Sequence, residues 1–438
     1  MAGWCQQVCG ALAALVVLPM VVKTLNAASA GLWFSFQSVL LIINLTDFGL
    51  SFVVARQVAY SLHTRSGEVS PNSDFVPTRE GWKGVSDVYH ASRRLFRWGG
   101  WVAAAILVLL YHLILPLGKL LTQSSFETLL AWYLLGAATL LSLQTKPHLA
   151  LVEGTSKLYL TRFLGGTIQL LAGIGIITVL LLGGQLVEMA MVVCATSLLQ
   201  YVGAKYLVAR EVNDRLSSGD RLPTGLEGKF LKVAIPMGIL NLSSFLFSSI
   251  QVPLLGFLLG PEVVPGFFLA QRIGQMLNQA VMQLVSPQMP LFTLELAKAD
   301  RVAAGNRMQR TIRLVTTLAF LVNAGFFWGS PLLVELWVGP GRYIAPLVLL
   351  VMAVDYFLMS STVVWAQFVF AAGSNPFVWS TLLSAVLNVL LIWLLVPRFS
   401  LTGAALASLI AGSSINYWFV GWKGFCRLRE LKAAACIP

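Results

Sequence analysis

The sequence predicts an all-α, polytopic membrane protein with about twelve transmembrane helices in two parallel six-helix bundles. The first observation is composition: 57% of the 438 residues are hydrophobic, 11% are charged, and the mean hydropathy is +0.78. Soluble domains carry about 25% charged residues, so this chain cannot cover a soluble surface of its size. The second is a series of long apolar runs without strand-like alternation, which cross a membrane only as helices. The composition excludes a cytosolic enzyme, a disordered chain and a disulfide scaffold.

Twelve stretches meet the requirement of about 20 mostly apolar residues for a membrane-spanning helix. They are residues 4–22, 33–54, 99–117, 126–145, 163–183, 186–208, 232–258, 263–290, 312–332, 344–371, 376–396 and 400–422. The first stretch is short and contains Gln6, Gln7 and Pro19, and its nearest basic residue, Lys23, follows it. That order is the reverse of a cleaved signal peptide, so we interpret it as the first transmembrane helix.

The basic residues predict the orientation and an even number of spans. With the N-terminus inside, 25 of the 30 Lys and Arg fall in inner loops and the inner tail, whereas Lys23, Lys119, Arg342 and Arg398 fall outside. This asymmetry follows the positive-inside rule. We therefore expect both termini in the cytoplasm. We interpret the net charge of +12 as a topological signal rather than as a nucleic-acid-binding surface.

An internal repeat predicts two halves of similar plan. Three pairs of landmarks recur at an offset of 219 residues, half of the chain: Gly154 and Gly373, Gln169 and Asn388, and Gly184 and Gly403. A shift of six spans preserves orientation, so the halves would be parallel repeats, as in transporters that alternate access to a site between two bundles. We predict an N-terminal bundle over residues 1–209, a cytoplasmic linker over 210–229 and a C-terminal bundle over 230–438.

Polar side chains follow one face of four predicted spans, at helical spacings. They are Gln37, Asn44, Asp47 and Ser51 in the second span, Asn241, Ser244, Ser248 and Gln251 in the seventh, Arg272, Gln275, Gln279 and Gln283 in the eighth, and Asp355 and Thr362 in the tenth. Interhelical hydrogen bonding would explain any single stripe. Four stripes together favour a shared hydrated cavity. We assign eight residues to substrate binding: Gln37, Asn44, Asn241, Ser244, Arg272, Gln275, Gln279 and Gln283.

Three ionisable residues lie deep in predicted spans, where a charge costs at least ~2.5–3.5 kcal/mol. Arg272 suits a phosphate because its fork matches phosphate oxygens, and snorkelling to the outer interface is the alternative. Asp355, near the midplane of its span, suits a proton or a sodium ion, and a buried pair with an Arg or Lys is the alternative. We assign Asp355 and Asp47 to ion coupling.

No metal or organic cofactor is expected. The five Cys and four His match no metal-ligand spacing, and the sequence contains no Gly-x-x-x-x-Gly-Lys motif for direct use of ATP. Any transport would therefore be passive or coupled to H⁺ or Na⁺. The predicted outer loops are too short to hold a catalytic site, which argues against a membrane enzyme.

Short motifs occur in one order along the chain. They are Gly31-Leu-Trp-Phe, Thr46-Asp-Phe-Gly-Leu followed by Arg56, Leu259-Gly-Pro-Glu-Val followed by Ala270-Gln-Arg, and the ends Ala372-Gly373, Asn388, Pro397 and Gly403-Ala-Ala. Their sum resembles the bacterial O-antigen and exopolysaccharide flippases, MATE-like members of the multidrug/oligosaccharidyl-lipid/polysaccharide (MOP) transporter superfamily. Asp47 lies in a variant Asp-Phe-Gly, and the insert at 63–81 has no counterpart with a known role.

The resemblance implies two six-helix bundles that move an undecaprenyl-pyrophosphate-linked oligosaccharide to the outer leaflet of the bacterial cytoplasmic membrane. Implied partners are this lipid-linked oligosaccharide, membrane lipids, and polysaccharide polymerase and chain-length proteins. Cavity charges vary in that family, so no site residue carries over from it. A MATE-type, cation-coupled multidrug antiporter is the alternative. Such antiporters favour acidic cavities, and Arg272 argues mildly against one.

Reporter fusions test the predicted topology. A fusion after residue 70 should report a cytoplasmic location, because that loop is rich in Lys and Arg. A fusion at residue 340 should report an external location, because that loop is poor in them. The same location at both positions would contradict the twelve-span topology.

Overall fold

The computed structural model shows a chain of helices. It describes residues 2–45, 47, 49–63, 79–117, 119, 125–155, 157–212, 228, 235, 238–285, 288–298, 300–339, 345–372 and 376–433. The chain forms two compact units, Met1–Asn241 and Leu242–Pro438. Most of the predicted linker 210–229 and of the insert 63–81 lies outside the described residues.

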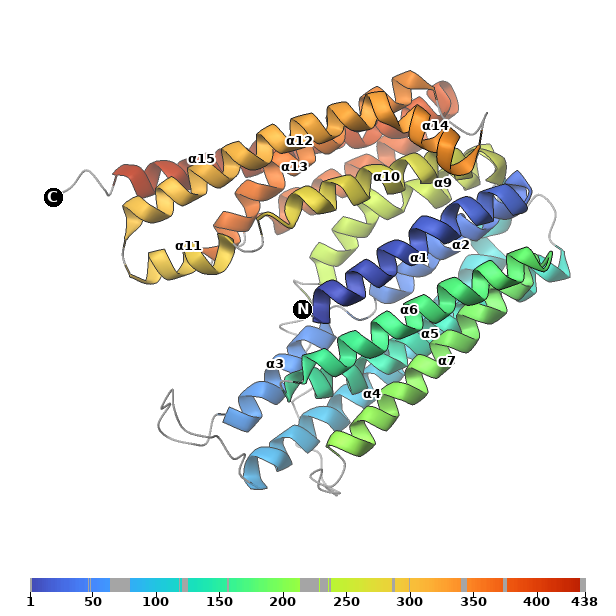
Figure 1. Ribbon diagram of the computed structural model, residues 1–438, viewed down its shortest axis with the longest axis horizontal. Coiled ribbons are helices and arrows are strands. Elements are labelled where there is room, and N and C mark those ends of the chain that lie inside the picture. The colour runs from blue at the N-terminus through green and yellow to red at the C-terminus, as the bar shows by residue number, and fades with distance from the viewer. Residues whose placement is uncertain are drawn as a thin grey trace. The chain divides into compact units, whose positions relative to one another are not determined.

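The N-terminal unit consists of long helices packed side by side (Figure 1). Its described elements are α1 (Ala2–Thr24), α2 (Ala27–Leu45), α3 (Leu50–His63), α4 (Arg79–Leu109), the turns η1 (Leu110–Ile114) and η2 (Leu115–Leu117), α5 (Phe126–Gly154), α6 (Leu158–Leu181) and α7 (Leu186–Glu211). α1 packs along α6, and α5 packs along α7. Side chains cap the helix starts: Ser125 accepts the Thr128 N–H at α5, and Gln185 and Glu188 form a capping box at α7.

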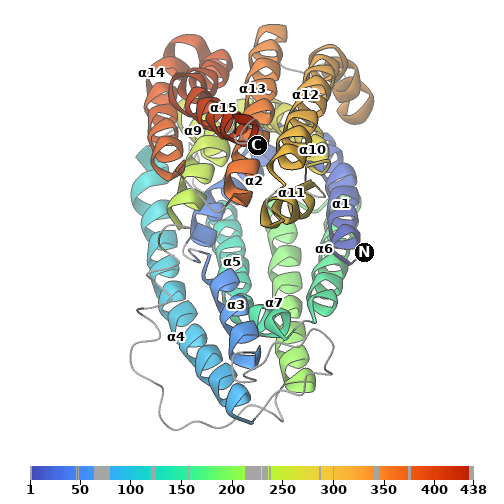
Figure 2. The same cartoon turned by 90° about the vertical axis from the view of Figure 1, so that its left-hand side faces the viewer.

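The C-terminal unit also consists of helices (Figure 2). Its described elements are the helix Gly238–Ser249 with its π-helical end η5 (Phe245–Ser249), α9 (Gln251–Leu259), η6 (Pro261–Val263), α10 (Val264–Met282), α11 (Gln288–Ala297), α12 (Arg301–Val338), α13 (Pro346–Ala371), α14 (Val378–Ala411), the π-turn η7 (Gly412–Asn416) and α15 (Tyr417–Ala433). α13 lies at the centre of this unit and contacts α10, α12, α14 and α15.

Seven of the described helices are long and apolar enough to cross a membrane, or eight if the helix Gly238–Ser249 and α9, bent by 46°, form one span. α1 and α2 contribute only shorter apolar helices, Ala13–Thr24 and Ala27–Ile43. The structure therefore agrees with an all-α, polytopic membrane protein, whereas the number twelve stays a prediction.

Two predicted spans are interrupted in the structure. The second, 33–54, divides into α2 and α3 because Asp47 turns the chain: its carbonyl accepts the Leu50 N–H at 2.7 Å. The eighth, 263–290, divides into α10 and α11, and Pro287 between them lacks the N–H that a continuous helix needs. Apolar composition alone did not reveal either break.

Gln169 and Asn388, one pair of the predicted repeat, each contact another helix of their own unit, and the repeat itself stays a prediction. Gln169 of α6 packs against Gly10 of α1, and the Asn388 amide of α14 donates to the carbonyls of Leu246 and Phe247 in the first helix of the C-terminal unit.

The two last predicted spans, 376–396 and 400–422, meet at a sharp turn inside α14. Ser400 has φ 52° and ψ −133°, far from helical values. A Cβ on Gly403 would collide with the backbone of Leu395, so only glycine allows this close approach.

Candidate functional site

A small cavity with several polar side chains in its lining lies inside the C-terminal unit. Its volume is about 60 Å³. Its polar lining consists of Ser248, Gln251, Gln271, Gln275, Asp355, Tyr356 and Ser408. One water needs roughly 10–15 Å³ of such volume, so the cavity can hold a few waters or a cation with water, and it is too small for a sugar chain.

Asp355 of α13 is the acidic group of this cavity and is 6% exposed. The Tyr417 hydroxyl donates to its Oδ1 at 2.7 Å, and the Ser408 hydroxyl lies within hydrogen-bonding reach of the same carboxylate. In the described part of the chain no Lys or Arg forms an ion pair with Asp355. Neutral donors therefore hold the carboxylate, and the alternative of a buried pair with a cation is not observed.

A π-helical turn brings Tyr417 to Asp355. Ser408 and Tyr417 are nine residues apart and would lie on roughly opposite faces of a regular α-helix. The turn η7 between them changes that register, and both side chains face the carboxylate. A Cβ on Gly412 would collide with the Tyr417 ring, so the glycine at the start of η7 makes room for this hydroxyl.

Hydrogen bonds to buried glutamines fix the rest of the lining. The Gln271 amide donates to the Ser248 carbonyl at 2.9 Å and to Gln251 Oε1 at 3.1 Å, and the Tyr356 hydroxyl donates to the Gln271 carbonyl at 3.2 Å. Gly274 lies directly against the Tyr356 ring, where a Cβ would not fit. The lining thus combines a few oriented oxygen atoms, the ligand type that hard cations prefer, with apolar side chains such as Met352 and Met359.

A second π-helical turn borders the cavity. η5 precedes α9, and its Phe247 and Ser248 line the cavity. The Asn388 amide donates to the Phe247 carbonyl at 3.0 Å and so satisfies one backbone acceptor of this turn. π-turns within α-helices are rare and occur frequently at functional sites; here η5 borders the cavity, and η7 orients Tyr417 toward Asp355.

The structure brings two of the predicted site residues, Asp355 and Gln275, to this cavity. Arg272 is half-buried on α10 next to Gln271 and is not part of the lining. Among the described residues no acidic side chain pairs with Arg272.

The other predicted substrate-binding residues do not line the cavity, so their role stays a prediction. Gln279, Asn241, Ser244 and Gln37 are exposed, Gln283 is half-buried at the end of α10, and the side chain of Asn44 lies outside the described part.

The sequence analysis did not single out Gln271, Tyr356 and Ser408 of the cavity lining, or Tyr417, which contacts Asp355. Tyr417 and Ser408 lie in an apolar span, and the π-turn that aligns them leaves no periodic signal. The predicted stripe of the eighth span did not include Gln271. Gln271 and Gln275 are nevertheless four residues apart and share a helical face, and both line the cavity.

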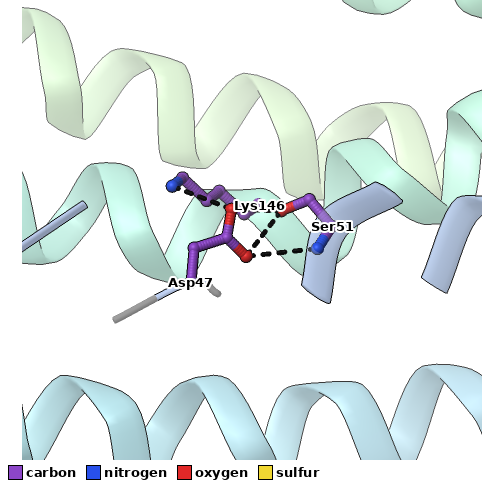
Figure 3. A network of polar contacts seen from close by, with 3 residues as sticks. All are labelled: Asp47, Ser51 and Lys146. Carbon is purple, nitrogen blue, oxygen red and sulfur yellow. Dashed lines mark hydrogen bonds and ion pairs between the residues drawn. The ribbon is translucent and has the colours of Figure 1, made fainter. Parts of the chain in front are cut away.

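Asp47 has a different environment in the N-terminal unit (Figure 3). Its Oδ2 accepts from Lys146 Nζ of α5 at 3.1 Å, and its Oδ1 accepts the Ser51 N–H at 3.1 Å. The Ser51 hydroxyl donates to the same carboxylate. Asp47 therefore caps the start of α3 and ties the break between α2 and α3 to α5. These contacts favour a structural role, and ion coupling at Asp47 stays a prediction.

Clusters of metal-ligating side chains were sought throughout the described residues. No group of three or more His, Cys, Asp or Glu lies close enough there to hold a metal ion. The cavity around Asp355 thus contains a single carboxylate.

The fold is similar to that of solved transporters. No protein-family model and no curated protein matches the sequence. An inward-facing multidrug resistance MATE transporter of the MOP superfamily aligns with a TM-score of 0.75 at 14% identity, over 98% of this chain and 99% of the other. The lipid II flippase MurJ, in an inward closed conformation, aligns with a TM-score of 0.69 at 12% identity, over 98% and 88%.

A MOP-superfamily transporter from Pyrococcus furiosus, described as having a binding pocket of reverse polarity, aligns with a TM-score of 0.57 at 14% identity, over 99% of this chain and 94% of the other. The chain therefore has, along nearly its whole length, the all-α, polytopic membrane fold of the MATE and MOP-superfamily transporters.

A double-mutant cycle tests the role of Asp47. Asp47→Asn and Lys146→Met should each destabilise the protein, and the double variant should lose less than the sum, with a coupling free energy of about 1 kcal/mol, since a charged hydrogen bond is lost only once. Equilibrium unfolding in detergent measures it. The exposed pair Arg427 and Glu430 serves as control, with an expected coupling of roughly 0.3–0.5 kcal/mol. Equal coupling in the two cycles would contradict the structural role.

Proposed function

We propose that this protein is an alternating-access transporter that moves a lipid-linked oligosaccharide from the inner to the outer leaflet of the bacterial cytoplasmic membrane, coupled to protons or sodium ions through Asp355. The observation that carries the proposal is the buried Asp355 carboxylate, which lies on the apolar helix α13, lines a small cavity and is held by neutral donors. A carboxylate without a cationic partner at that depth is costly to maintain and is by default a functional group.

The cavity supports ion coupling rather than binding of an organic substrate. The cavity volume of about 60 Å³ can hold a few waters that carry a proton, or a small cation with water. The Tyr417 and Ser408 hydroxyls can donate to the charged carboxylate, and a hydroxyl can also turn its lone pairs toward a bound cation. Protonation or cation binding would change these hydrogen bonds, which link α13 to α14 and α15.

Arg272 supports an anionic substrate. A pyrophosphate cannot cross hydrocarbon without cationic groups along a hydrated path. Arg272 is half-buried in α10, and no acidic side chain neutralises it in the described chain. The sequence resemblance to polysaccharide flippases and the similar fold of a lipid II flippase support the same substrate class.

A cation-coupled multidrug antiporter is the second candidate. It is favoured by the TM-score of 0.75 with a multidrug resistance MATE transporter and by the acidic group at Asp355. Efflux of cationic drugs from vesicles, with no movement of lipid-linked oligosaccharide, would select this function.

We also propose an orientation and a set of partners for the protein. Both termini would face the cytoplasm, because the basic residues lie on that side. Its partners would be the lipid-linked oligosaccharide, membrane lipids, and polymerase and chain-length proteins that extend the exported oligosaccharide.

Substitution of Asp355 tests ion coupling. Asp355→Asn should abolish the dependence of transport on pH or Na⁺, because the amide keeps the shape of the side chain but binds neither a proton nor a cation strongly. The measurement is transport into proteoliposomes across imposed pH and Na⁺ gradients. Wild-type transport with wild-type ion dependence would show that Asp355 is a structural residue.

Tyr417→Phe is the matched variant, since it removes only the hydroxyl that contacts Asp355. If protons drive transport, the pH profile of this variant should differ from that of the wild type, because the charged carboxylate loses a hydrogen-bond donor worth roughly 1.5 kcal/mol or more. An unchanged pH profile would contradict the role given to this hydrogen bond.

Substitution of Arg272 tests the anionic substrate. Arg272→Ala should abolish flipping, so that lipid-linked oligosaccharide accumulates in the inner leaflet at unchanged protein level. Arg272→Lys should reduce the rate about tenfold without abolishing it, because a point charge attracts phosphate but lacks the bidentate fork. Normal surface polysaccharide in cells with the Ala variant would leave snorkelling as the better account of Arg272.

A further inference from the structure

A second, larger hollow lies between α11 and α12, away from the Asp355 cavity. Its volume is about 600 Å³, and its walls include Leu284, Gln288, Glu295, Arg307, Arg310 and Leu314. α11 follows the end of α10, and the chain then reverses so that the start of α12 lies beside α11 (Figure 1). We refer to this hollow as the α11–α12 groove.

One arginine of the groove is fully engaged and fixes its wall. Arg307 donates to Glu295 Oε1 from Nε at 2.8 Å and from Nη2 at 2.6 Å, and its Nη1 donates to Gln288 Oε1 at 3.0 Å. These two bonds to one carboxylate oxygen join α12 to α11. The charges of Arg307 and Glu295 cancel, so this pair adds no net charge to the groove.

Arg310 supplies the net charge of the groove. It lies one helical turn after Arg307, is exposed, and lines the same hollow. In the described part of the chain no acidic side chain forms an ion pair with it. The groove therefore presents one uncompensated guanidinium, with its five donors, beside the oxygen and nitrogen atoms of Asn306 and Thr311.

The groove spans the border between the polar and apolar parts of α12. With 38 residues this helix is about 57 Å long, well beyond the ~30 Å of the hydrocarbon core. Arg301, Arg307, Arg310 and Arg313 all lie in its first part, and the apolar sequence begins at Leu314. Arg310 and Leu314 are four residues apart and so share one face.

Exposed apolar side chains also line the groove. Leu314 is 53% exposed and Leu284, at the end of α10, is 44% exposed, and both line the groove. A cation followed directly by exposed aliphatic walls matches a molecule with a phosphate at one end and hydrocarbon at the other. A free phosphate would use the cation but not the walls.

We propose that the α11–α12 groove is a binding site for the phosphate of an anionic lipid, with Arg310 as its cationic contact and Leu284 and Leu314 beside the hydrocarbon. The lipid can be a bulk phospholipid or an isoprenoid diphosphate, since both present phosphate on an apolar tail. The proposal does not depend on the transport function.

Binding of a fluorescent phosphatidylglycerol to the purified full-length protein in detergent tests the site. R310Q should weaken binding about tenfold, because one charge-assisted contact is removed from an exposed side chain on a helix surface. R313Q is the matched control: Arg313 is exposed on the same helix but does not line the groove, so its affinity should stay within twofold of wild type. A zwitterionic phosphatidylcholine probe should bind wild type and R313Q more weakly than phosphatidylglycerol does, and R310Q should largely lose this preference.

Competition identifies the source of the phosphate. Displacement by unlabelled phosphatidylglycerol but not by farnesyl diphosphate assigns the groove to bulk lipid, and preferential displacement by farnesyl diphosphate assigns it to isoprenoid diphosphates. Displacement by millimolar inorganic phosphate alone would overturn the lipid assignment. Equal affinity of wild type, R310Q and R313Q would overturn the site itself.

Discussion

The buried Asp355 carboxylate needs hydrogen-bond donors, and much of the local structure follows from that need. Tyr417 supplies one donor, and it reaches Asp355 because η7 shifts the helical register and Gly412 leaves space for its ring. Ser408 supplies another from the preceding helix. A regular α-helix through residues 408–417 would leave the carboxylate with at most one of these partners.

Asp47 of the N-terminal unit and Asp355 of the C-terminal unit have different kinds of hydrogen-bond partner. Asp47 is paired with Lys146 and caps α3, so its charge is neutralised and its position is fixed in every state that keeps α3 and α5 together. Asp355 has only neutral partners, whose hydrogen bonds can rearrange when a proton or cation binds. A paired acid stabilises a fold, whereas an unpaired buried acid can respond to ions. This difference is the physical basis for assigning coupling to the C-terminal unit.

The sequence predicted the membrane fold and the position of Asp355, because apolar length and an isolated charge are local signals. The sequence could not tell which polar side chains of a stripe line a cavity and which bond to a neighbouring helix. Asn278 is bonded to Asn323 of α12 by reciprocal amide hydrogen bonds of 3.2 and 3.1 Å, while the next residue, Gln279, is exposed. The π-turns, the break at Asp47 and the Arg307–Glu295 pair depend on contacts between segments far apart in the chain, so no short sequence window contains them.

The ionisation of Asp355 is the central claim, and infrared difference spectroscopy of the purified protein in lipid measures it directly. Lowering the pH should produce a protonated-carboxyl band that is absent in Asp355→Asn and shifted in Tyr417→Phe, and added Na⁺ should suppress that band if the cavity binds the cation. A carboxyl band that neither substitution alters, or the absence of any response to pH and Na⁺, would contradict the assignment of this cavity as the ion-coupling site.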